Sequence, residues 1–233
     1  MCAHARDERT TSPELGGRGW LVALAVCLGF AAATGCETRR IGDGSAGGEQ
    51  TLVFSDDFER KRLGDDWHRG QGENGSGEWS IDDGWIAARS IRNDPLWLDR
   101  ELPKKVRVEW KAKALTDRGD LKVEIFGDGE NHESGYILIF GGWDNSLDVI
   151  ARLDEHGDDR KEQKTEGVEK GKVYRMAVER TDGQLRWYID GELHMTYDDP
   201  SPLRGEGHRH FAFNNWEVPV RYDDLRVYRL SGD

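Results

Sequence analysis

The feature that most constrains the fold is a hydrophobic pattern of period two, which runs from Thr51 to the end of the chain. In residues 106–113 Val, Val, Trp and Ala alternate with Arg, Glu, Lys and Lys, and residues 121–125 and 147–154 repeat this alternation. Alternation at every second position is typical of strands that bury one face, whereas the continuously apolar residues 134–140 predict a strand covered on both faces. We see no helical stripe, so the sequence predicts an all-β, two-sheet antiparallel sandwich.

Short turns separate the predicted strands. Asp82-Asp83-Gly84 lies between two apolar segments, and Asp182-Gly183 and Asp190-Gly191 occupy equivalent places further along the chain. Such turns close antiparallel hairpins because Gly and Asp accept a positive φ. We expect a core that includes Phe211, Phe213 and four tryptophans, which are Trp79, Trp85, Trp110 and Trp187.

The N-terminal residues predict export. Residues 20–35 are apolar and then small, and Cys36 follows at once. The apolar part is shorter than the roughly 20 residues that cross a bilayer, so we interpret residues 1–35 as a signal peptide. The segment Ala33-Thr34-Gly35-Cys36 resembles a bacterial lipobox, which implies cleavage before Cys36 and attachment of acyl chains such as palmitate. An ordinary secretory signal and a single-pass anchor are the alternatives.

This interpretation predicts a lipid-anchored domain. Cys36 would be the only cysteine left after cleavage, so the exported domain could form no internal disulfide. Residues 36–50 contain four glycines and almost no apolar residues and would form a flexible tether, with the folded domain at 51–230. We expect an exported protein in a bacterial cell envelope, attached to a membrane through lipid. Its net charge of −12 argues against a nucleic-acid partner.

Three segments carry a resemblance to a known superfamily. Residues 171–203 contain a W-Y-I-D-G hairpin, 222–228 read Y-D-D-L-R-V-Y, and 54–58 read F-S-D-D-F. Together they resemble concanavalin A-like lectin/glucanase domains over Leu52 to Leu230. The resemblance implies a jelly-roll sandwich, a fold that serves laminin-G-like modules, carbohydrate-binding modules, family 16 glucanases and 3-keto-disaccharide hydrolases. It implies the fold and leaves the function open.

The glucanase branch can be tested in the sequence. Its retaining chemistry needs two carboxylates about 5 Å apart, supplied on one strand by an E-x-D-x-x-E pattern. That pattern is absent: Asp120 and Glu124 have a different spacing, and the alternation places Glu124 on the solvent side beside Lys122. We therefore expect a non-catalytic protein rather than an enzyme.

One polar face is predicted to carry the ligand site. If Leu147, Val149 and Ala151 point into the core, the residues between them point outward, and the same phase applies around Phe211 and Trp187. Aromatic rings pack on sugar C–H groups while polar side chains bind hydroxyls. The candidate ligand-binding residues are Trp143, Asn145, Asp148, Arg152, Asp154, His156, Arg186, Tyr188, His208, His210, Asn214 and Trp216.

Simpler roles exist for several of these residues. Trp143 and Trp216 could pack in the core, and Arg152 with Asp154 could form a surface pair. The two histidines, His208 and His210, fit a solvated pair better than a metal site.

The two ends of the domain predict a structural calcium site. In the superfamily the first and last strands often meet around this ion, and the resemblance places Asp57 and Asp224 there. Plain acidic loop edges are the alternative.

These observations favour non-catalytic binding of a glycan or cell-envelope polysaccharide. A hydrolase or lyase of the 3-keto-disaccharide type is the second hypothesis, and it would use a cluster made of Asp148, Arg152, Asp154, His156 and His208. A structural or protein-binding envelope module is the third.

Overall fold

The computed structural model describes residues 38–39, 49–71 and 77–232. The expected signal peptide, the expected lipidation site at Cys36 and most of the expected tether lie outside these residues. No helix within the described part of the chain is long and apolar enough to cross a membrane.

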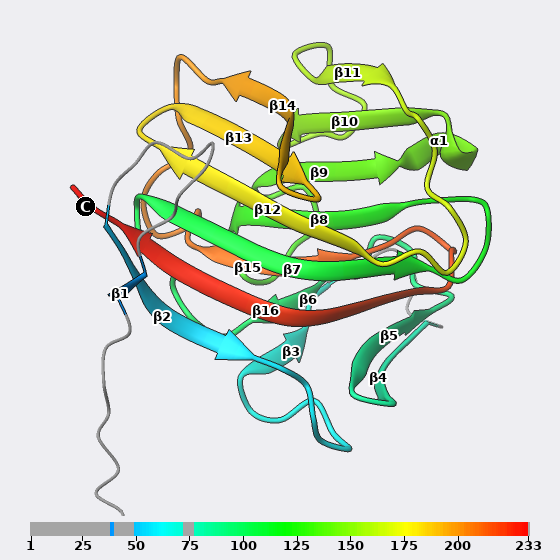
Figure 1. Ribbon diagram of the computed structural model, residues 1–233. Coiled ribbons are helices and arrows are strands. Elements are labelled where there is room, and N and C mark those ends of the chain that lie inside the picture. The colour runs from blue at the N-terminus through cyan, green and yellow to red at the C-terminus, as the bar shows by residue number, and fades with distance from the viewer. Residues whose placement is uncertain (1–37, 40–48, 72–76, 233) are drawn as a thin grey trace, which may run out of the picture. The chain divides into compact units, whose positions relative to one another are not determined.

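The described strands form two antiparallel sheets stacked as two layers (Figure 1). The first is a nine-stranded sheet, in which β4 and β5 form a hairpin attached to β16. Its strands, in spatial order, are β1 (Thr38–Arg39), β2 (Gln50–Asp56), β16 (Val220–Leu230), β7 (Val106–Ala114), β12 (Tyr174–Thr181), β13 (Gln184–Ile189) and β14 (Glu192–Asp198), with β4 (Glu78–Asp82) and β5 (Trp85–Arg89).

The second is a seven-stranded sheet, and the one short helical turn in the described residues, α1 (Gly142–Asn145), joins two of its strands. Its strands, in spatial order, are β11 (Lys161–Lys164), β10 (Leu147–Arg152), β9 (Tyr136–Gly141), β8 (Leu121–Gly127), β15 (His210–Asn214), β6 (Leu96–Leu98) and β3 (Trp67–Arg69). The predicted all-β sandwich is therefore correct, and β2 and β16, which lie at the two ends of the domain expected at 51–230, are neighbours.

The expected end of the tether differs in detail from the structure. Gln50, expected to be its last residue, is the first residue of β2 and only 2% exposed, and Thr38–Arg39 pairs with that strand. Two residues of the segment expected to be free therefore add an edge strand to the nine-stranded sheet.

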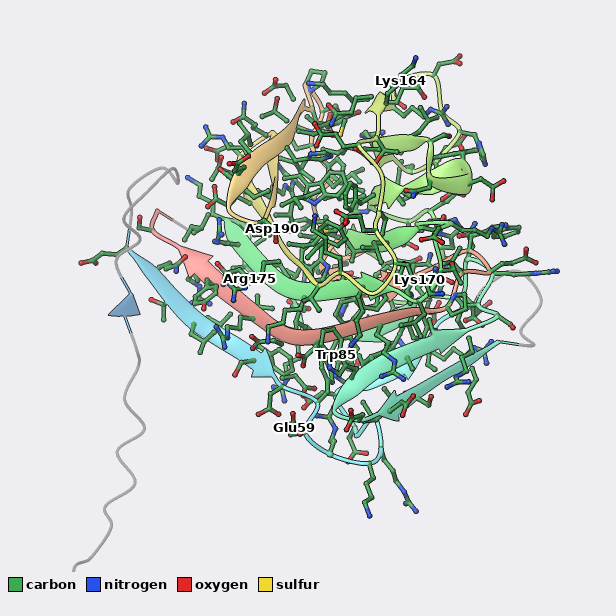
Figure 2. The ribbon with its side chains drawn as sticks, turned by 45° about the vertical axis from the view of Figure 1, so that its right-hand side comes forward. Glu59, Trp85, Lys164, Lys170, Arg175 and Asp190 are labelled. Atoms are coloured by element: carbon green, nitrogen blue, oxygen red, sulfur yellow. The ribbon has the colours of Figure 1, made fainter. Side chains whose placement is uncertain are left out.

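The core between the sheets is aromatic and aliphatic. Trp79, Trp110 and Trp187 are buried there, as predicted. Trp85, labelled in Figure 2, was predicted to join them, and this is wrong. It is half-buried outside the core, where the Lys113 ammonium lies 3.9 Å from its ring centre. The reason is the phase of β5, in which Ile86 faces inward and Trp85 faces the opposite way.

Strand β10 also has the opposite phase to the one predicted. Ile150 lies in the main core, whereas Val149 and Ala151 form a second apolar cluster with Ile137 and Ile139. The inner face of β10 carries Asp148 and Arg152 beside Ile150, where they pair with His194 and Asp199, while the covered outer face carries Val149 and Ala151. The polar residues therefore mark the inner side of this strand, opposite to what the alternation predicts.

Candidate functional site

The outer face of the seven-stranded sheet, on the side away from the other sheet, is the most unusual surface of the molecule. Strand register places on it Lys122, Ile139, Val149 and Asn214 in one row, and Glu124, Ile137 and Ala151 in the next. None of these seven side chains is more than 1% exposed. We call this surface the covered face.

A pocket of about 510 Å³ opens at one end of the covered face. Segments far apart in the sequence meet there, from the loop before β6 to the loop after β15. Its lining consists of two tryptophans, six ionisable residues and three others: Trp143, Trp216, Arg118, Asp120, Lys122, Asp144, Glu155, His156, Asn93, Ile139 and Val218.

A buried ion pair forms the floor of the pocket. The Lys122 ammonium lies 2.8 Å from Glu155 Oε2 and donates a second hydrogen bond of 2.8 Å to Asn93 Oδ1. Burial alone would lower the pKa of Lys122, but the negative charges of Asp120 and Glu155 outweigh it and raise that pKa. Burial alone would raise the pKa of Glu155, but Lys122 outweighs it and lowers that pKa. Both groups are therefore held in their charged forms.

A second polar group lies beside the ion pair on the covered face. Glu124 Oε1 lies 2.7 Å from His132 Nδ1 and accepts a 2.6 Å hydrogen bond from Asn214, while its Oε2 accepts one from the Glu133 backbone. His132 Nε2 is buried without a hydrogen-bond partner, and the nearest carboxylate oxygens, on Glu133 and Glu155, lie 3.9 Å away. The covered face thus carries a polar network beside the apolar cluster of Ile137, Ile139, Val149 and Ala151.

Asp120 stands at the start of β8 with a left-handed backbone, at φ 64°. Its Oδ1 accepts a 3.0 Å hydrogen bond from the Trp216 backbone N–H, and its side chain lines the pocket although the residue is only 8% exposed. Burial raises the pKa of Asp120, and this effect exceeds the opposing attraction of Lys122. Asp120 is thus a carboxylate whose charge the protein compensates only partly.

The two tryptophans of the pocket are held by different contacts, Trp143 through its ring and Trp216 through its backbone. Trp143 lies in α1 at φ 49°. Its ring has the Arg160 guanidinium 4.9 Å from its centre and the His156 ring edge-on at 5.6 Å. Trp216 is fixed through its backbone by Asp120 and by a bridge to Arg92. Both side chains are half-buried, so neither belongs to the main core.

Three of the predicted site residues line this pocket: Trp143, His156 and Trp216. Asn145 supports the pocket from behind, because its side chain bonds the Val168 backbone N–H and the carbonyls of Asp117 and Val168 at 2.7–3.0 Å. Asp154 is exposed, and its carboxylate accepts the His156 backbone N–H at 2.8 Å.

Asp148 and Arg152 are not on this face. Because β10 has the opposite phase, Asp148 points between the sheets, is fully buried and bonds His194 Nε2 at 2.9 Å. Arg152 pairs with Asp199 at 3.0 Å and not with Asp154. The single face predicted from residues 148–156 therefore does not exist.

Arg186 and Tyr188 belong to the other sheet. Arg186 bonds Gln184 at 2.6 Å along β13, and the Tyr188 hydroxyl donates to Glu179 on β12 at 3.1 Å. Their outward direction was predicted correctly relative to Trp187, but the outer faces of the two sheets point in opposite directions.

The two histidines of the β15 segment form hydrogen bonds to backbone carbonyls of neighbouring segments. His208 Nδ1 lies 2.9 Å from the Ser134 carbonyl, and His210 Nδ1 lies 3.2 Å from that of Leu98. Neither lines the pocket. Asn214, from the same segment, lies on the covered face but is fully buried.

The carboxylates proposed for calcium are committed to protein partners. Asp224 forms ion pairs with Lys111 at 3.2 Å and Arg226 at 2.8 Å, and Asp57 accepts the Glu59 backbone N–H. Among the described residues, no group of three or more His, Cys, Asp or Glu side chains could hold a metal ion. The geometry at this edge does not fit the proposed site.

Sequence reasoning missed the pocket's charged floor. Lys122 and Glu124 were placed correctly on the outer side of β8 but were interpreted as solvated, and Glu155 was passed over between Asp154 and His156. The only signal was three charges at alternate positions 120, 122 and 124 on an otherwise apolar strand.

Comparisons with known proteins support the fold. No family model and no curated protein matches the chain. A carbohydrate-binding module, CBM66 from Bacillus subtilis, matches 70% of this chain and 96% of its own length, with 15% identity and a TM-score of 0.56. An endo-β-1,3-glucanase from Pyrococcus furiosus matches 84% and 99%, with 13% identity and a TM-score of 0.56. At such identities the likeness shows a jelly-roll fold, which agrees with the superfamily resemblance of the sequence.

Proposed function

We propose that this protein binds a glycan, without catalysis, in the pocket at the end of the covered face. The observation that carries the proposal is that Trp143 and Trp216, 73 positions apart in the printed sequence, line one pocket together with Asp120, Lys122 and Glu155. Half-buried aromatic rings beside fixed polar groups are the usual composition of a sugar site. The fold likeness to a carbohydrate-binding module and to glucanases is consistent with it.

Glycan-array binding followed by titration calorimetry tests the proposal. Trp143→Ala and Trp216→Ala should each weaken binding by about tenfold or more, since each removes one aromatic contact. The matched control is Trp85→Ala, because Trp85 is also half-buried but lies outside the pocket. Unchanged affinity in both pocket variants would contradict the proposal.

We also propose that the domain is lipid-anchored in a bacterial envelope through Cys36. The support is the apolar run 20–35 and the segment Ala33–Cys36. Fractionation of expressing cells should find the protein with membranes, and Cys36→Ser should release it. A Cys36→Ser protein that stays in the membrane fraction would favour the single-pass anchor.

A hydrolase or lyase is the second candidate, and one observation favours it. Asp120 and Glu155 line the same pocket, and their environments move their pKa values in opposite directions, as in acid/base pairs. Release of new reducing ends or unsaturated sugars from a bound glycan, lost in both Asp120→Asn and Glu155→Gln, would support catalysis. Binding without any product would support recognition alone.

A further inference from the structure

The charges of the pocket indicate which class of glycan it takes. Three carboxylates line it, on Asp120, Asp144 and Glu155, against two permanent cations, Arg118 and Lys122. Both cations are already paired: Arg118 Nε lies 2.9 Å from Asp144, and Lys122 Nζ lies 2.8 Å from Glu155. The carboxylate left without an ion-pair partner of its own is that of Asp120.

We infer that the ligand carries a protonated amine, as a deacetylated hexosamine does, and that this ammonium binds Asp120. The inference rests on the proposed function, because it uses the same pocket. Asp120 shares the charge of Lys122 with Glu155 and forms no ion pair of its own among the described residues, so a ligand ammonium would supply the missing donors and complete the charge compensation. A uronate or a phosphorylated glycan would instead add a negative charge beside a buried carboxylate.

The geometry around Asp120 suits such a ligand. Its Oδ1 is occupied by the Trp216 backbone N–H, so the same hydrogen bond fixes the carboxylate and the aromatic residue beside it. Trp143 lines the same pocket. A sugar ring packed on either tryptophan would lie beside the charged floor, and aromatic faces also attract a nearby ammonium group. Burial raises the pKa of Asp120, so the protein alone does not fully compensate the charge of this carboxylate.

Three oligosaccharides of one backbone test the inference: the β-1,4-linked tetramers of glucosamine, N-acetylglucosamine and glucose. They differ at carbon 2, which bears an ammonium, an acetamide or a hydroxyl group. Calorimetry at one slightly acidic pH should give the glucosamine tetramer an affinity at least about tenfold above the other two. Added salt should reduce this preference, because screening weakens the charge interaction.

The decisive variant is Asp120→Asn. Asn tolerates the left-handed backbone at this position and keeps an oxygen for the Trp216 N–H, so the fold should survive. The matched control is Asp83→Asn, since Asp83 is an exposed aspartate with φ 54° in the β4–β5 turn, outside the pocket. Both variants change the net charge equally, so nonspecific attraction of a cationic sugar to this acidic protein affects them alike.

The expected result is that Asp120→Asn abolishes the preference for the amine, whereas Asp83→Asn retains it. Equal binding of the three tetramers, with loss in Trp143→Ala, would overturn the inference and leave the proposed function in place. An amine preference that survives Asp120→Asn would also overturn it. Absence of binding by every tetramer would count against both the inference and the proposed function.

Discussion

The two outer faces of the sandwich each carry a paired lysine, and the two lysines differ in their exposure to solvent. On the nine-stranded sheet, Lys111 pairs with Asp223 and Asp224 at 3.2–3.5 Å while its side chain remains 34% exposed. On the seven-stranded sheet, the Lys122 side chain is 1% exposed and pairs with Glu155. Both lysines alternate with apolar residues in their strands, so the sequence pattern is the same. The difference is local cover, which excludes solvent from Lys122 and leaves Lys111 partly open to it.

Burial changes what an ion pair does for the protein. A solvent-exposed pair gains little, because water already solvates both charges. A buried pair has lost that solvation, so removal of one partner leaves a charge that nothing compensates. The covered face therefore concentrates polar groups whose partners are obligatory, and the pocket opens directly onto them.

The largest expected effect contrasts the two lysines. Lys122→Ala should reduce the free energy of unfolding by about 3–5 kcal/mol, because Glu155 and Asp120 lose their shared cation. Lys111→Ala should cost less than about 1 kcal/mol. Urea unfolding at neutral pH measures both values, and similar losses in the two variants would show that the covered face is open to water in solution.

A second pair of variants examines the phase of β10. Asp148→Ala should reduce the free energy of unfolding by about 1–3 kcal/mol, because the buried Gly141 N–H and His194 lose their acceptor. Asp154→Ala should remain within about 0.5 kcal/mol, since Asp154 is exposed. The sequence pattern placed both residues on one solvent-facing side and would predict equal, small effects, which unfolding curves can distinguish.

These contrasts separate the features of the fold that the sequence predicts from those that it does not. Alternation and turn residues were enough for the strands and for the two-layer fold, because local periodicity reports which segments are extended. The inner face was assigned correctly for β7, where charged residues mark the solvent side, and incorrectly for β10, where Val149 and Ile150 are both buried. In β10 the charged residues Asp148 and Arg152 lie on the inner face, where His194 and Asp199 pair with them, so polarity did not mark the solvent side.

The site was only partly predictable for a related reason. Trp143 and Trp216 stood out because their neighbours in the sequence are loop-forming and polar. His156 was selected from the phase predicted for β10, which the structure reverses, although the residue does line the pocket. Glu155 and Asn93 reach Lys122 through contacts between loops distant in the sequence, and no local pattern encodes such contacts. Arg186 and Tyr188 were misplaced because strand phase gives the direction of a side chain relative to its own sheet, without saying which sheet that is.

The smallest expected effect has the opposite sign. Asp120→Asn should raise the free energy of unfolding at neutral pH, because burial disfavours the charged carboxylate and Asn keeps the hydrogen bond to Trp216. The folded-state pKa of Asp120 lies above the ordinary 3.8, so the folded protein binds the proton more tightly than the unfolded chain does. The stability of the wild type, relative to the variant, therefore falls as the pH rises from about 3.8 and levels off above the folded-state pKa.

Thermal unfolding of the wild type and Asp120→Asn across this pH range measures the difference in stability between them. Asp83→Asn is the control, and its stability should match that of the wild type. A stabilised variant that has lost its preference for an amino sugar would show that Asp120 serves binding at a cost to stability. Asp120→Asn that is less stable at neutral pH would instead mean that Lys122 depends on Asp120 as much as on Glu155. Asp120 would then belong to the buried network of the covered face rather than to the ligand.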